Sequence, residues 1–372
     1  MIAIGIMGIS FLMGMFNRKS KMVAVIISLY MWVFYSFNTY SGDSAAYEYV
    51  YQLISEGYVF GHFEIGFTIL MLMCSKIGLS FSGFRFVLGT IYIVALNKVI
   101  KKYTDNIAIV LALFMIFPFM YFTSVLRAGI AGLIVVNSVQ HLSVKGKKGI
   151  FMYAIGILFA MLFHTSSMFF FVLVLARKKI SQRTVIKIIV VTTIVSFLFR
   201  NAVFYKVFSI FTQNAKILQW LNGDGTASSA LNITGIVAEI SLLIMILFIV
   251  SRANKLERQC GVEGKRMKQC ELIKSCNFYL LTLIPFMIIS DVWMRMVWEF
   301  LLIDICMFAN VIEDLHEKSF LNRNKFAISY FGLVVIMLEI IIFLYMDRPY
   351  WGTDNMAVNM FYNNRLLGML PF

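Results

Sequence analysis

Long apolar runs, separated by short polar segments, extend along almost the whole chain. A helix needs about 20 mostly apolar residues to cross a bilayer, and these runs lack the strict alternation of half-buried strands. Several runs are short, so we expect some segments to be broken, tilted or re-entrant. The predicted membrane segments lie near residues 1–16, 22–40, 64–80, 84–100, 107–124, 126–142, 150–163, 165–177, 185–199, 232–251, 276–291, 295–312 and 326–345.

The composition supports a membrane protein. Only 14% of the 372 residues are charged and 60% are hydrophobic, whereas a soluble domain carries about a quarter charged residues. Most of the surface must therefore face lipid. The runs are continuous rather than divided into the alternating segments of about ten residues that mark a membrane β-barrel. We predict an all-α, polytopic transmembrane bundle of about 11–13 segments, with residues 1–372 forming a single domain.

Basic residues gather in particular loops and predict the orientation. Lys and Arg are typical of cytoplasmic loops, which we assign to 17–21, 98–102, 145–148, 177–183, 252–274 and 316–325. By contrast, the 40–63 loop has neither Lys nor Arg, and we predict that it is extracytoplasmic and contains an amphipathic helix. The 200–231 loop and the 346–372 tail are sparsely basic, and we also place them outside.

One part of this topology conflicts with the charge rule. If 64–80 and 84–100 both cross the membrane, the lysines of 98–102 lie outside. Either one segment is re-entrant or these lysines violate the rule. The net charge of +14 reflects the cytoplasmic loops rather than nucleic-acid binding, because no basic stripe is interleaved with stacking aromatic residues.

Several kinds of chemistry have no motif in this chain. The sequence contains no Walker A motif, no G-x-G-x-x-G, no H-E-x-x-H and no acid cluster spaced for Mg²⁺. Its five cysteines are too scattered for a disulfide framework or a zinc site. We therefore expect neither a cofactor nor a metal, and the sequence argues against an ATP-driven pump and an intramembrane metalloprotease.

Charged residues at the edges of apolar runs are functional candidates because burying them in a membrane is costly. Asp43 is followed by Tyr47 and Tyr51, which share one face of a helix with it. Asp43 is either an N-cap or a functional acid, and the sequence leaves both open. Glu64 opens an apolar run, where it is either a first-turn acid favoured by the helix dipole or a group that orients or deprotonates a substrate hydroxyl.

Two further residues stand alone in apolar surroundings. Arg127 has no acid near it in sequence, and its fork of donors suits phosphate oxygens, so we favour an anionic ligand as its partner. His164 is either a structural histidine or a functional one, and both remain open. Asp291, Arg295 and Glu299 are spaced i, i+4, i+8 on one helix face, and an internal ion-pair ladder is the preferred interpretation.

The order of these motifs resembles a known family. D-x-x-x-Y-x-x-x-Y begins at Asp43, E-x-G-F at Glu64, I-G-L-S-x-S-x-F-R ends at Arg85, L-R-x-x-I-A spans 126–131 and F-H-x-S spans 163–166. The set resembles the EpsG-type, Wzy-like polysaccharide polymerases of bacteria over about residues 20–180. Those proteins usually have Arg-Gln where this chain has Arg-Ala.

The resemblance implies a GT-C-like, metal-independent glycosyltransferase of the hexosyltransferase type. Such a polymerase transfers a growing glycan from undecaprenyl pyrophosphate onto the next lipid-linked repeat unit at the outer face of the membrane. The product belongs to exopolysaccharide, capsule or O-antigen biosynthesis. The implied location is the bacterial cytoplasmic (inner) membrane, with several crossings. Implied partners are the lipid-linked oligosaccharide, membrane lipid, a chain-length regulator and a flippase, and no nucleic acid is implied.

Site roles follow from combining the resemblance with the candidates above. We expect catalysis from Asp43, His164 and Glu64, and binding of pyrophosphate or lipid-linked glycan by Arg127, Arg295, Arg85, Tyr47 and Tyr51. The alternatives are a flippase or transporter of lipid-linked saccharides, an O-antigen-ligase-like enzyme and an acyltransferase acting on the polymer. A transporter of this type often shows related halves or matching broken helices, and the sequence shows neither.

Overall fold

The computed structural model describes residues 2–39, 43–58, 63–178, 180–199, 264–283, 285, 292–316 and 364–366. This part of the chain is mostly helical and forms no strand, which confirms the all-α prediction. One described helix, α5 (Phe81–Tyr103), is long and apolar enough to span a membrane. The 200–231 loop, the predicted segments at 232–251 and 326–345, and Asp291 lie outside the described residues.

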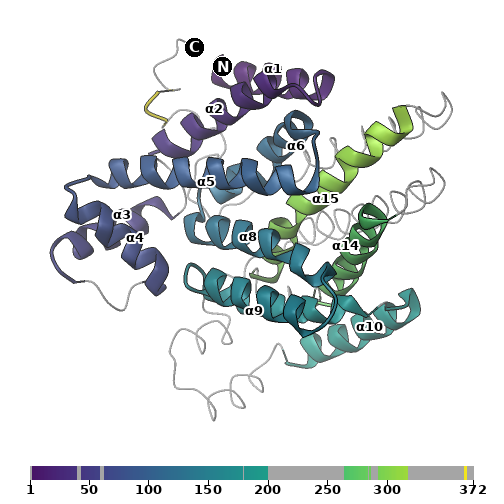
Figure 1. Cartoon of the computed structure of the whole chain (residues 1–372). Coiled ribbons are helices and arrows are strands. Elements are labelled where there is room, and N and C mark those ends of the chain that lie inside the picture. The colour runs from purple at the N-terminus through teal and green to yellow at the C-terminus, as the bar shows by residue number, and fades with distance from the viewer. Residues whose placement is uncertain are drawn as a thin grey trace.

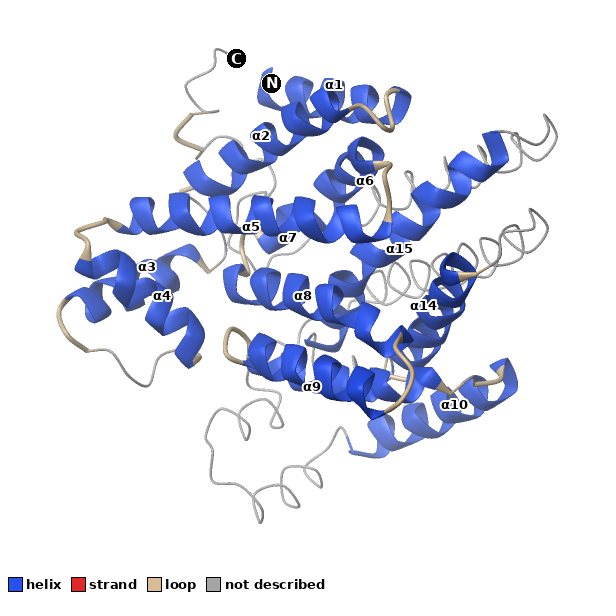
Figure 2. Ribbon diagram, in the orientation of Figure 1, coloured by secondary structure: helices blue, strands red, loops and turns tan. Residues whose placement is uncertain are grey.

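Most of the helices are short and pack side by side (Figures 1 and 2). α2 packs on α5, α8 on α9, α14 on the 3₁₀ segment η3, and α15 crosses α6 and α8. Besides α5, the described elements are α1 (Ile2–Phe16), α2 (Lys21–Phe37), α3 (Ser44–Ser55), α4 (Ile65–Lys76), α6 (Ile107–Phe114), η1 (Met115–Phe119), α7 (Met120–Phe122), α8 (Leu126–Val139), η2 (Gln140–Ser143), α9 (Lys147–Met161), η3 (Thr165–Arg177), α10 (Gln182–Phe199), α14 (Lys265–Leu281) and α15 (Val292–His316).

Local signals explain where two predicted segments end early or break. The 64–80 run becomes the shorter α4, because the chain turns at Gly78, whose φ of 78° is open to glycine at little cost. The 107–124 run is interrupted at Phe117 and Pro118, where the backbone leaves helical geometry. Proline lacks the N–H that a continuous helix uses. These are the short and broken segments that the sequence leads us to expect.

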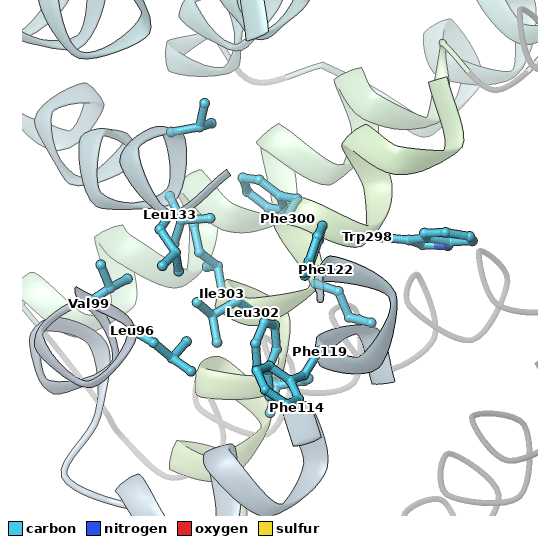
Figure 3. Packing of buried hydrophobic residues seen from close by; sticks show 14 of the residues in the cluster. Leu96, Val99, Phe114, Phe119, Phe122, Leu133, Trp298, Phe300, Leu302 and Ile303 are labelled. Carbon is cyan, nitrogen blue, oxygen red and sulfur yellow. The ribbon is translucent and has the colours of Figure 1, made fainter. Parts of the chain in front are cut away.

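The core lies where α5, α6, α8 and α15 meet. Figure 3 shows Phe114, Phe119 and Leu302 clustered there, and all three side chains are buried. Glycines bring the helices close enough for this packing. A Cβ added to Gly132 of α8 would lie 2.8 Å from Cγ of Glu299 on α15, so the Glu299 side chain lies directly across this glycine.

We expect Gly132→Ala to lower stability, since the added methyl group has to push α15 away from α8. Overpacking of this kind typically costs about 1–3 kcal/mol. The measurement is the thermal midpoint of the detergent-solubilised protein. Gly8→Ala in α1 is the matched control, because nothing lies within 4 Å of its added Cβ and alanine is the better helix former. A Gly132→Ala midpoint equal to or above that of Gly8→Ala would contradict the close packing.

Four of the basic loops lie at one end of the bundle. There the turn between α1 and α2 bonds to α6, the C-terminal end of α5 bonds to α8, and the end of η3 bonds to the loop before α9. The contacts are those of the Ala108 N–H with the Arg18 carbonyl (3.1 Å), the Lys102 ammonium with the Asn137 amide, and the Arg177 guanidinium with the Gly146 carbonyl (2.8 Å).

The other end of α2 is closed by residues far along the chain. The last carbonyl groups of a helix have no partner within it. The side-chain amide of Asn364 donates to the carbonyls of Val33 and Phe34, both at 3.2 Å, and the backbone N–H of Arg365 donates to Phe37 at 2.9 Å. Only 1% of the Asn364 surface is exposed. This contact fixes residues 364–366 at the end of α2 that leads to the 40–63 loop.

Candidate active site

Three helical segments begin close together at the end of the bundle opposite the basic loops. Glu64 precedes α4, Arg127 lies in the first turn of α8, and His164 precedes η3. Glu64 and His164 both have extended backbones, which turn their side chains away from the helices that follow. The structure thus brings together three residues that stand alone in the sequence.

The Glu64 carboxylate is the centre of the cluster. Its Oε2 accepts a hydrogen bond from Nη1 of Arg127. Its Oε1 accepts from the backbone N–H of Thr165 at 3.1 Å and from the Thr165 hydroxyl at 3.2 Å. Nδ1 of His164 lies 3.5 Å from the same oxygen. Both carboxylate oxygens are therefore occupied by protein groups.

The sequence favoured an anionic ligand as the partner of Arg127, and that ligand stays a prediction. In the structure Arg127 pairs with an acid, Glu64. This residue is 63 positions away in sequence, so the residues around Arg127 do not indicate the pairing. The guanidinium also lies 4.3 Å from the centre of the Phe63 ring and 5.9 Å from that of Tyr47, within cation–π range. Its Nε has no hydrogen-bond partner among the described residues.

His164 and Glu64 lie in the junctions between helices, and their protonation follows from their surroundings. Burial and the charges of Arg127 and Arg295 together lower the pKa of His164 more than the Glu64 carboxylate raises it, so the imidazole is neutral at neutral pH. Burial raises the pKa of Glu64, but the contact with His164 and the charge of Arg127 outweigh it, and the pKa lies well below its ordinary value. The pair therefore consists of a neutral base and an anionic acid.

Gly66 sets the distance between α4 and the residues before η3. Its backbone N–H donates to the Leu162 carbonyl at 2.8 Å. A Cβ added at Gly66 would lie 2.8 Å from that carbonyl oxygen and 2.9 Å from the Leu162 Cβ. The glycine of the E-x-G-F motif therefore allows two backbones to touch, and this contact places Glu64 beside His164 and Thr165.

Asp43 and Arg295 act electrostatically on residues in and beside this cluster. The Asp43 side chain makes no capping hydrogen bond to α3, and a catalytic role for this acid stays a prediction. Asp43 acts electrostatically on Tyr47, and so does Arg127. Arg295 acts on His164, and its guanidinium lies 6.0 Å from the centre of the Tyr121 ring.

Three predicted binding residues are turned into the core instead. Tyr47 is only 2% exposed and packs against Phe63 and Phe67. Tyr51 is also buried, and its hydroxyl donates to the Leu79 carbonyl at 2.7 Å. The two tyrosines do lie on one helix face, and that face is covered by α4 and α5. Their contact with a sugar stays a prediction.

Arg85 also has a structural position. It is 2% exposed and its Nη2 donates to the Tyr35 carbonyl at the end of α2, at 2.9 Å. A guanidinium at this place satisfies a helix C-terminus. Arg85 therefore stabilises the contact between α2 and α5, and its contact with pyrophosphate stays a prediction.

Sequence reasoning missed Thr165 and Phe63 as site residues. Thr165 is exposed, whereas the serines that follow it are buried. The available signal was its place at the first position of a helical segment, where a backbone N–H is free to bind an anion. In the described part of the chain no group of three His, Cys, Asp or Glu residues is placed to hold a metal ion. The cluster is suited to proton transfer and to anion binding.

Comparison with known proteins gives one result at the family level. The model of the EpsG family matches residues 21–358, which is most of the chain and includes every site residue described above. The comparisons with curated proteins and with solved structures gave no match. The match covers the segment from α2 to beyond α15, and the chain therefore belongs to the EpsG family.

Proposed function

We propose that this protein is a membrane glycosyltransferase that polymerises a polysaccharide. EpsG membership supports a polymerase-like, glycosyltransferase-like role, and together with α5 it supports a membrane location. The finer proposal is transfer of a growing glycan from undecaprenyl pyrophosphate onto the next lipid-linked repeat unit. The observation that carries it is the cluster of Glu64, Arg127, His164 and Thr165, which combines a neutral base with donors for an anion.

The proposed topology is a multi-pass protein of the bacterial cytoplasmic membrane. The end with the basic loops faces the cytoplasm, and the cluster faces outward. With 12 residues, α4 is about 18 Å long, which is too short for a hydrocarbon core of about 30 Å. If α3 and α4 both stay on the outer side, α5 alone crosses inward, and the lysines of 98–102 reach the cytoplasm. This resolves the conflict between the charge rule and two full crossings.

The proposed chemistry gives one role to His164 and another to Arg127. The acceptor hydroxyl oxygen attacks the anomeric carbon of the donor, and the bond from that carbon to the pyrophosphate oxygen breaks. His164 accepts the hydroxyl proton, while undecaprenyl pyrophosphate leaves with the electron pair. Arg127 stabilises the charge that grows on the leaving group, with Arg295 as a second guanidinium nearby. Asp43 is the alternative proton acceptor.

The test is to deplete the protein in cells that make the polymer and to locate the lipid-linked intermediates. We expect single repeat units to accumulate on the carrier lipid at the outer face, because export continues while polymerisation stops. Accumulation at the inner face would instead identify a flippase. Full-length polymer left on the carrier would identify a ligase, and polymer that lacks only acyl groups an acyltransferase. Each of these three results would contradict the proposal.

A further inference from the structure

The Glu64 carboxylate occupies a set of donors that resembles a phosphate site. Three hydrogen bonds converge on it, one from the Arg127 guanidinium and two from Thr165, through its backbone N–H and its hydroxyl. A guanidinium, a hydroxyl and a backbone N–H at the start of a helical segment are the groups with which proteins hold phosphoryl oxygens. The protein's own carboxylate therefore marks the position of an anion.

The occupied position opens to the surface. Thr165 is exposed, and the side chains of Arg127 and Glu64 keep 18% and 15% of their surface accessible. An incoming anion can therefore reach the same donors without opening the core. The Glu64 side chain makes no capping hydrogen bond to α4. Loss of its present contacts would leave the first turn of α4 unchanged.

We propose that Thr165 and Arg127 form a subsite for a phosphoryl group, and that Glu64 fills this subsite only while no substrate is bound. The identity of the ligand as a polyprenyl pyrophosphate rests on the proposed function above. Thr165 is then a substrate-binding residue, and Glu64 competes with the substrate. An internal group that competes for the site weakens binding, because the apparent affinity is the intrinsic affinity multiplied by the fraction of time that the site is empty.

The test is binding of undecaprenyl pyrophosphate to the full-length protein in phosphatidylcholine nanodiscs. Glu64→Asp keeps the charge but shortens the side chain, so the carboxylate no longer reaches both donors. We expect Glu64→Asp and Glu64→Gln each to bind about tenfold tighter, since one charge-assisted contact no longer has to be broken. Thr165→Val is expected to bind about tenfold more weakly, and Thr165→Ser to bind like the wild type. Glu48→Gln, an exposed acid on α3, controls for net charge.

The outcomes separate the possible explanations. If only Glu64→Gln binds more tightly, repulsion between charges explains the result and the competing role is wrong. If both Glu64 variants bind more weakly, Glu64 helps to hold the ligand and the proposal is overturned. Should the Glu64 variants fail to fold, unchanged binding by Thr165→Val would still overturn it. Inorganic pyrophosphate is expected to displace the lipid from every variant, with affinities that rank the variants in the same order. If it does not, the subsite does not bind a phosphoryl group.

The readout is binding and not polymerisation, so the two proposals fail separately. A wild-type protein that binds the lipid pyrophosphate, with no effect of Thr165→Val, leaves the polymerase proposal standing and rejects the subsite. A wild-type protein that binds neither undecaprenyl pyrophosphate nor inorganic pyrophosphate rejects the subsite as well. Depletion that leaves polymer length unchanged rejects the polymerase.

Discussion

Replacing Arg127 with alanine is expected to stop polymerisation, with a loss of about a thousandfold or more in turnover. Removal of one donor to a developing anion costs about a hundred- to a thousandfold, and an arginine on a phosphoryl leaving group contributes at least as much. Arg127→Lys is expected to restore little, because an ammonium lacks the planar fork. The measurement is polymer length in cells with matched protein levels, where single repeat units should accumulate at the outer face.

Loss of Arg127 also leaves the Glu64 carboxylate without its cation, and lost stability could be mistaken for lost catalysis. Loss of a partner from a partly buried charged group costs about 1–3 kcal/mol. The double variant Arg127→Ala/Glu64→Ala removes both partners, so we expect it to regain most of the thermal stability but none of the polymer. Arg183→Ala on α10, an exposed position, is the matched control. Normal polymer from Arg127→Ala would exclude this guanidinium from the reaction.

Gly66→Ala is expected to have the second largest effect, about a hundredfold loss of polymerisation. The added methyl group meets backbone atoms of Leu162, at 2.8 Å from the carbonyl oxygen and 3.1 Å from the carbonyl carbon, and these cannot swing aside as a side chain can. α4 and the residues before η3 must then move apart, which displaces His164, the proposed proton acceptor, from its position. Misplacement of a reacting group by about 1 Å costs on the order of a hundredfold in rate.

This prediction is checked by polymer length together with thermal stability. Gly5→Ala in α1 is the control, because nothing lies within 4 Å of its added Cβ. We expect Gly5→Ala to polymerise normally. If Gly66→Ala does so as well, the contact between α4 and Leu162 does not set the geometry of the site, and its glycine needs another explanation.

The fold could be predicted from the sequence where apolar runs were long and ended by clear signals. Lys21–Phe37 and Phe81–Tyr103 begin after Ser20 and Ser80, whose side chains cap them by accepting from the backbone N–H groups of Val23 and Gly83. The predicted segment lengths were wrong where a single residue ends or interrupts the helix, as at Gly78 and Pro118. A window of hydrophobicity does not register one turn residue inside an apolar run.

The sequence could predict which residues belong to the site but not which of them contact one another. Arg127, His164 and Glu64 stood out because each is charged or titratable beside an apolar run. That Arg127 meets Glu64 depends on the fold, and no local pattern contains it. Tyr51 and Arg85 lie at the motif positions that the sequence indicated, but both side chains are buried in the core. Periodicity defines a helix face and leaves open what covers it.

The contact of Asn364 with the end of α2 has a consequence for the order in which the molecule is assembled. Its partner carbonyls lie 331 and 330 residues earlier in the chain. During synthesis, α2 emerges from the ribosome long before Asn364 exists, so these two carbonyls lack the Asn364 amide in the meantime. This end of α2 therefore gains its contact with Asn364 only after nearly the whole chain has left the ribosome.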